Sequence, residues 1–145
     1  MNTKIIKSLF GGVIGAIIMS MVMWLFPMVG IPRMSPPDML STMMGIPIII
    51  GWLMHFMIGI IFALTYAFFF INLVKKITGP ILRGAIFGIA VFIFAQIMLA
   101  ILEAILNGIP PTEESIVLIM TGSIIGHIVF GIVVALLVKE EITIK

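Results

Sequence analysis

The chain has 145 residues, of which 62% are hydrophobic and only 10% are charged, and its mean hydropathy is +1.36. A soluble domain carries about 25% charged residues, so this composition excludes an ordinary soluble protein and predicts an integral membrane protein with one transmembrane domain over residues 1–145. The chain has no cysteine, which excludes disulfides and thiolate metal sites, and its net charge of +2 is too small to indicate nucleic-acid binding.

Charged residues divide the chain into four apolar windows, at 8–32, 39–74, 84–102 and 115–138. A membrane-spanning helix needs about 20 apolar residues, so each window predicts one crossing. The first crossing is expected to be a helix of the protein and not a cleaved signal. We therefore predict four transmembrane helices, at approximately 6–28, 46–74, 80–107 and 113–138.

The segment between the first two crossings contains the signals of a short helix. Ser35 and Asp38 have the spacing of a capping box, Pro36 and Pro37 suit a first helical turn, and Gly45 suits a helix end. We predict a helix at approximately 36–44 that rests on the membrane surface.

The basic residues predict the orientation of the chain in the membrane. On an up-and-down path of four helices, Arg33 falls on one side, and all other basic residues fall on the opposite side: Lys4, Lys7, Lys75, Lys76, Arg83, Lys139 and Lys145. Because cytoplasmic loops carry the excess of lysine and arginine, both termini are expected in the cytoplasm, with the protein in the inner (cytoplasmic) cell membrane.

Small residues recur at helical spacing in every crossing. Residues four apart share a helix face, and small side chains allow helices to approach closely in a bilayer. We predict helix-packing surfaces at Gly12, Ala16, Ser20, Gly51, Gly59, Ala63, Gly84, Gly88, Gly122, Gly126, Gly131 and Ala135.

Two of these surfaces also indicate an internal repeat. The segment 51–63 matches the segment 123–135, 72 positions later, because both place small, His, small and small residues at intervals of four. We predict a four-helix bundle that is a duplicated helical hairpin, in which helices 1 and 2 correspond to helices 3 and 4. Such repeats are related by a pseudo-twofold axis along the membrane normal.

His55 and His127 occupy matching positions of the two repeats. An ionisable side chain inside a membrane is a functional candidate, so the pair could bind a metal or supply both axial ligands of haem b. Alternatively, each neutral imidazole forms hydrogen bonds that join neighbouring helices. The haem interpretation requires the two rings to lie at the same depth in the membrane.

Other polar and sulfur-containing residues suggest weaker alternatives. Gln96 and Glu103 lie seven apart on the third crossing and could form a relay with a histidine in a small proton or ion transporter, although Glu103 could also reach water at the membrane surface. The 13 methionines raise the possibility of a copper site, but methionine is also a common filler of apolar space.

In its length, hydropathy, glycine-rich crossings and Gly-Ile-Pro loops at 30–32 and 108–110, the chain resembles small four-helix membrane protein families of prokaryotes with no characterised activity. The resemblance implies no catalysis and no cofactor, and the chain has no nucleophile–base or zinc motif of an enzyme. We expect a non-catalytic membrane protein that contacts the lipid bilayer and acts as an accessory or structural subunit of a larger complex, or as a homo-oligomer.

Overall fold

The computed structural model describes residues 2–106 and 114–138, and most of these residues are helical. The described part of the chain contains no strand, so the predicted all-α class is confirmed. The long helices are α1 (Asn2–Leu25), α3 (Ile48–Thr65), α5 (Pro80–Ile105) and α6 (Ile116–Leu137), and the shorter elements are η1 (Phe26–Val29), α2 (Pro36–Met44), η2 (Tyr66–Phe70) and α4 (Ile71–Leu73).

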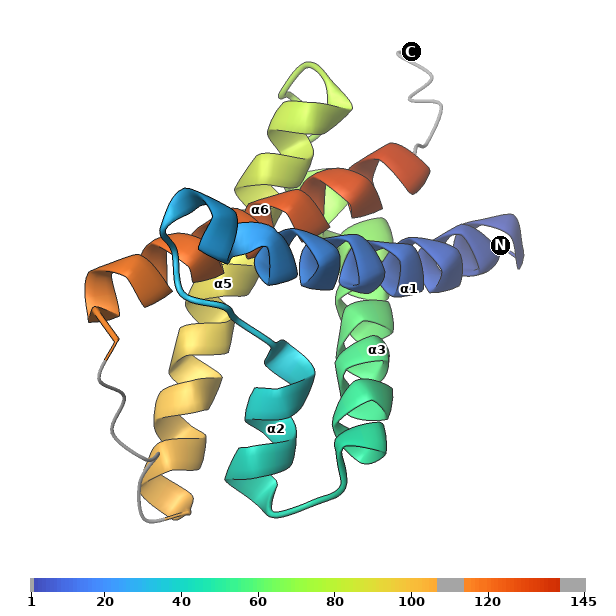
Figure 1. Cartoon of the computed structure of the whole chain (residues 1–145). Coiled ribbons are helices and arrows are strands. Elements are labelled where there is room, and N and C mark those ends of the chain that lie inside the picture. The colour runs from blue at the N-terminus through green and yellow to red at the C-terminus, as the bar shows by residue number, and fades with distance from the viewer. Residues whose placement is uncertain (1, 107–113, 139–145) are drawn as a thin grey trace.

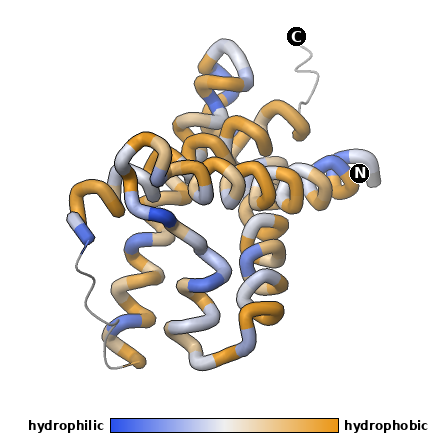
Figure 2. The backbone as a smooth tube through the Cα atoms, in the orientation of Figure 1, coloured by the Kyte–Doolittle hydropathy of each residue, from blue (hydrophilic) through white to orange (hydrophobic). Residues whose placement is uncertain are grey.

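Four helical segments are long and apolar enough to cross a membrane, as the four windows predict. The predicted boundaries at 107 and 113 lie outside the described residues. Hydrophobic residues run along each helix, and hydrophilic residues gather mainly at the connections and chain ends (Figure 2). The four segments are Thr3–Val29, Ile48–Leu73, Pro80–Ile105 and Ile116–Leu137.

The helix ends on one side of the molecule follow from local chemistry. Pro27 lies in the 3-10 turn η1, and Gly30 ends that turn with a φ of 79°. The hydroxyl of Ser35 accepts a hydrogen bond from the backbone N–H of Asp38 at 3.4 Å, which caps α2. Gly45 ends α2 with a φ of 62°, a conformation that glycine adopts without steric cost.

The long helices form two crossed pairs, α1 with α3 and α5 with α6 (Figure 1). In this view α1 and α6 run across the molecule in opposite directions, whereas α3 and α5 run down it. The helix α1 also packs along α6, so it lies between α3 and α6. The short helix α2 turns back and packs against the beginning of α3.

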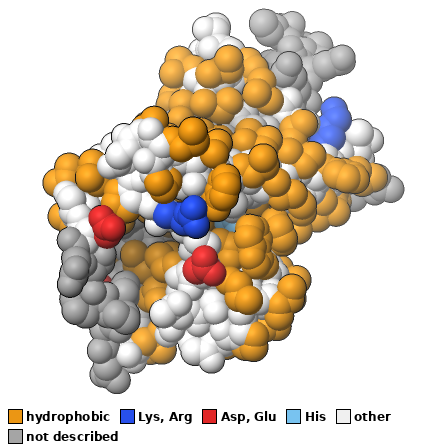
Figure 3. Space-filling view, viewed as in Figure 1, with side chains coloured by type: hydrophobic (Ala, Val, Ile, Leu, Met, Phe, Trp, Pro, Cys, Tyr) orange, Lys and Arg blue, Asp and Glu red, His pale blue; other side chains and the backbone are white. Residues whose placement is uncertain are grey.

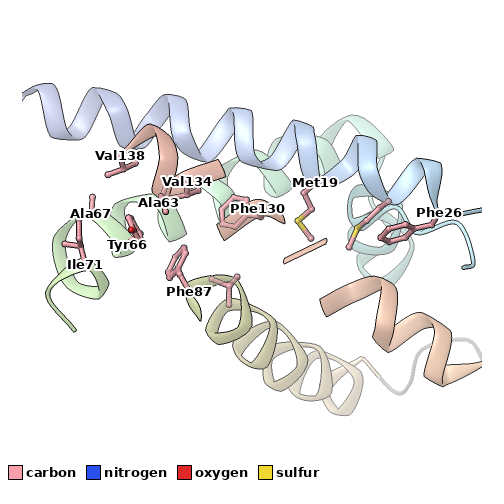
Figure 4. Close-up of a cluster of buried hydrophobic side chains, with 13 residues drawn as sticks. Met19, Phe26, Ala63, Tyr66, Ala67, Ile71, Phe87, Phe130, Val134 and Val138 are labelled. Carbon is pink, nitrogen blue, oxygen red and sulfur yellow. The ribbon is translucent and has the colours of Figure 1, made fainter. Parts of the chain in front are cut away.

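A cluster of buried apolar side chains lies where α1, η2, α5 and α6 meet (Figure 4). At its centre, the ring of Phe87 lies 5.0 Å from the ring of Tyr66 and 4.9 Å from the ring of Phe70. Further along, the rings of Phe62 and Phe94 are 5.5 Å apart. Thus α3 and α5 meet through aromatic rings, whereas the crossed pairs meet through their backbones.

Candidate functional site

The crossing of α1 and α3 depends on glycine. A Cβ atom added at Gly12 would lie 2.5 Å from the Cα of Ile60 and 2.7 Å from the carbonyl oxygen of Gly59. A Cβ atom at Gly59 would lie 2.8 Å from the Gly12 carbonyl oxygen and 3.3 Å from the Cβ of Ala16. The two backbones therefore touch at this crossing, and a larger residue would separate them.

The crossing of α5 and α6 is built in the same way. A Cβ atom at Gly84 would lie 2.5 Å from the Cα of Ile132, and one at Gly131 would lie 2.5 Å from the backbone nitrogen of Gly88. A Cβ atom at Gly88 would collide with the carbonyl group of His127. The turn of α6 that carries His127 is consequently in backbone contact with α5.

A third glycine contact, between α1 and α6, was missed by the sequence reasoning. Gly11 faces Val138, and a Cβ atom at Gly15 would lie 2.9 Å from the ring of Phe130. The available signal was a second row of residues four apart on α1, which starts at Gly11 and continues through Gly15 to the buried side chain of Met19. Thus α1 packs on α3 through one row and on α6 through the row beside it.

The remaining predicted packing residues are also buried, but against different neighbours. Gly51 contacts the Pro37 carbonyl at the start of α2, and Gly126 receives the side chain of Met23. Gly122 contacts side chains only, of which the nearest atom is the sulfur of Met34. Two alanines, Ala63 and Ala135, lie in the apolar core.

His55 is buried between α3 and α1. Its Nε2 atom lies 3.1 Å from the hydroxyl of Ser20, and the backbone of Ala16 also hydrogen-bonds to the ring. The aromatic ring of Trp52 lies 6.3 Å from the imidazole on the same helix. Both polar contacts come from α1, so His55 joins the two helices of this crossed pair.

His127 has a different environment on α6. Its Nδ1 atom lies 2.7 Å from the Ser123 carbonyl oxygen of its own helix, and the ring of Phe92 on α5 lies 5.8 Å away, edge to face. One turn earlier, the side-chain amide of Gln96 donates a hydrogen bond to the Ser123 hydroxyl at 3.4 Å. Gln96, Ser123 and His127 thus form a polar group at the α5–α6 interface.

The two imidazoles are close enough to interact electrostatically, but their chemistry differs. The position that corresponds to Ser20 after 72 residues is Phe92, which has no hydroxyl group. His127 therefore has no partner equivalent to Ser20 and turns its Nδ1 atom to its own helix. Figure 3 shows one histidine side chain at the surface of the molecule.

Glu103 is exposed and lies near the C-terminal end of α5, away from both histidines in sequence. Within residues 2–106 and 114–138, no group of three or more His, Asp and Glu side chains is placed to hold a metal ion. The acidic and basic side chains are few on the face that Figure 3 presents, where apolar side chains predominate.

Four apolar helices of membrane-spanning length, joined by backbone contacts at glycine, place the protein in the class of small polytopic α-helical membrane proteins. The chain belongs to a family of unknown function (DUF6789), whose model matches residues 2–141. Comparison with curated proteins and with solved structures gives no match.

Proposed function

We propose that the protein is a non-catalytic membrane subunit that assembles with another membrane helix through the C-terminal half of α5. The observation that carries this proposal is the exposure of Ala100 and Ala104 within a membrane-spanning helix. In its most apolar window, α5 is only 17% buried, against 39% for α1. Small residues on an unpaired helix face permit close approach of a further helix.

The packing of the other small residues supports the choice of α5. Gly12, Gly59, Gly84, Gly88 and Gly131 are already in contact inside one molecule, so they are not available to a partner. Past its crossing with α6, α5 presents Ala100 and Ala104 one turn apart with no described helix against them. The partner is a second copy of the chain or a helix of another subunit.

Photo-crosslinking from single cysteines tests this proposal, because the native chain has no cysteine. Ala100→Cys and Ala104→Cys, each labelled with benzophenone maleimide in native membranes, are expected to form a cross-linked product of defined mass. Met98→Cys is the matched control, since Met98 is exposed on the opposite face of the same helix. Equal cross-linking from Met98 and Ala104, or none from either alanine position, contradicts the proposal. The mass of the product distinguishes a homo-oligomer from another subunit.

We also infer that the chain is a duplicated hairpin. The supporting observation is that contacts repeat with the offset of 72 residues: Gly12 meets Gly59 and Ile60, and Gly84 meets Gly131 and Ile132. A close α1–α6 packing without an equally close α3–α5 packing limits the symmetry to the two hairpins. Exchange of residues 2–73 with residues 74–138 by circular permutation is expected to retain helical content and stability.

For the topology, we propose that both termini face the cytoplasm in the inner membrane. The Nζ atom of Lys4 lies 5.0 Å from the ring of Phe68, which places the start of α1 beside the end of the second span and near Lys76. Lys139 and Lys145 lie outside the described residues. A membrane-impermeant maleimide applied to intact cells is expected to label Asp38→Cys but not Lys76→Cys, and the reverse pattern refutes the orientation.

Haem ligation by His55 and His127 is the alternative function. It is favoured by the electrostatic interaction between the two rings. It requires His55 to exchange its contact with Ser20 for iron, and the haem to lie away from the turn where Gly88 touches His127. A Soret band in the purified protein that disappears in His127→Ala would establish it, and a spectrum without this band would exclude it.

A further inference from the structure

The Nε2 atom of His127 is an open hydrogen-bond acceptor inside the membrane-spanning region. The carbonyl oxygen of Ser123 can only accept, so the Nδ1 atom at 2.7 Å carries the hydrogen. In the neutral imidazole Nε2 then has a free lone pair. Among the described residues, no donor is placed to bond to this atom. His127 is only half-buried, so a membrane-dissolved molecule can approach it.

The neighbours of this atom indicate which kind of molecule fits. Phe92 presents an aromatic ring beside the imidazole, and Gln96 is fixed one turn away by its bond to Ser123. On the lipid-facing side of α5, Ile93 and Ile97 are 53% and 55% exposed, so an apolar tail can leave directly into the bilayer. The site therefore combines one acceptor, one aromatic ring and an apolar exit.

Two other occupants are less compatible with these contacts. A bare divalent ion in a membrane needs anionic or multiple ligands, and the described residues contain no such group. A macrocycle cannot enter between α5 and α6 at this level, because Gly88 is in contact with the carbonyl group of His127. A single ring with a hydroxyl group requires less space and supplies the missing donor.

We propose that His127 accepts a hydrogen bond from the hydroxyl group of a lipid-soluble phenol or hydroquinone that binds at the α5–α6 pair beside Phe92 and Gln96. The step is binding only, with no bond broken and no electron transferred. The site does not include Ala100 or Ala104. The ligand titration and the cross-linking experiment can therefore succeed or fail independently.

The test uses ¹⁵N-histidine NMR on the full chain in lipid nanodiscs, because the protein has only two histidines. Decylubiquinol is expected to shift the Nε2 signal of His127 in a saturable manner and to leave the ring signals of His55 in place. The oxidised form, decylubiquinone, has no hydroxyl donor and is the matched control. The proposal is overturned if the quinol shifts neither ring, if the quinone produces the same shift, or if decanol does so as effectively as the quinol.

Variants provide a second measurement. His127→Phe keeps a ring but removes the acceptor, and loss of one hydrogen bond is expected to weaken decylubiquinol binding by about tenfold. His55→Phe makes the same chemical change at the matching position and is expected to leave the affinity unchanged. An equal loss in both variants, or a haem absorption band in the purified wild-type protein, contradicts the proposal.

Discussion

Replacement of Gly131 by alanine tests whether backbone contact at the α5–α6 crossing stabilises the fold. The new Cβ atom would lie 2.5 Å from the Gly88 nitrogen and 2.8 Å from the Gly88 Cα, whereas ordinary van der Waals contact begins near 3.4 Å. Because these neighbours are backbone atoms, the helices must separate by about 1 Å. A gap of that size forfeits about a quarter to a half of the dispersion energy of each contact, and overpacking typically costs about 1–3 kcal/mol.

Gly122→Ala is the control for this prediction, because Gly122 lies on the same helix and would contact only side chains, with the flexible Met34 nearest at 2.7 Å. Alanine also raises helix propensity by about 1 kcal/mol in both variants, so the comparison isolates the contact. Unfolding by SDS in mixed micelles, followed by the fluorescence of Trp24 and Trp52, measures the free energy. The reasoning is refuted if Gly131→Ala is as stable as the wild type, or if the two variants lose equal stability.

Three further changes can be measured in the same unfolding assay. Ser20→Ala removes the hydroxyl partner of the buried His55 and is expected to cost about 0.5–1.5 kcal/mol, whereas Thr121→Ala, whose hydroxyl is exposed and bonds to its own helix, should cost less. Phe87→Ala leaves a cavity among the rings of the core and is expected to cost about 3–5 kcal/mol. Gly45→Ala is expected to cost about 1–2 kcal/mol through its φ of 62° alone, since no atom lies within 4 Å of the added Cβ, and an unchanged stability would contradict the assigned turn.

The hydrophobic pattern was sufficient to predict the helices, because a span of about 20 apolar residues between charges has few alternatives. It could not predict how the helices cross. Four residues turn a helix by about 400°, so a row of every fourth residue drifts around the helix by about 40° per step. On α3 this row meets α2 at Gly51, α1 at His55 and Gly59, and the core at Ala63.

The same drift explains α5, where one row was expected to form a single packing surface. Gly84 and Gly88 face α6, Gln96 reaches Ser123 at the edge of the interface, and Ala104 is exposed. From Gly84 to Ala104 the row rotates by about 200°. The spacing therefore predicted which residues are small, but not that the last of them face away from α6.

The histidines illustrate a further limit of pattern reasoning. Their matched spacing indicates a pair, but the role of each ring is decided by the residue opposite to it on the neighbouring helix. Opposite His55 this residue is Ser20, which supplies a hydroxyl, and opposite His127 it is Phe92, which does not. A repeat can thus conserve the position of a polar group while its chemistry changes from a helix link to an open acceptor.

One substitution between the repeats also accounts for the unequal packing of the two hairpins. Gly15 on α1 allows α6 to approach, and the position 72 residues later is Phe87, whose ring instead packs on Tyr66 and Phe70. A phenylalanine occupies space that the glycine leaves to the neighbouring backbone, so α5 stays farther from α3 than α1 does from α6. The C-terminal half of α5 is consequently left with few neighbours, which is the physical reason why we place the assembly surface there.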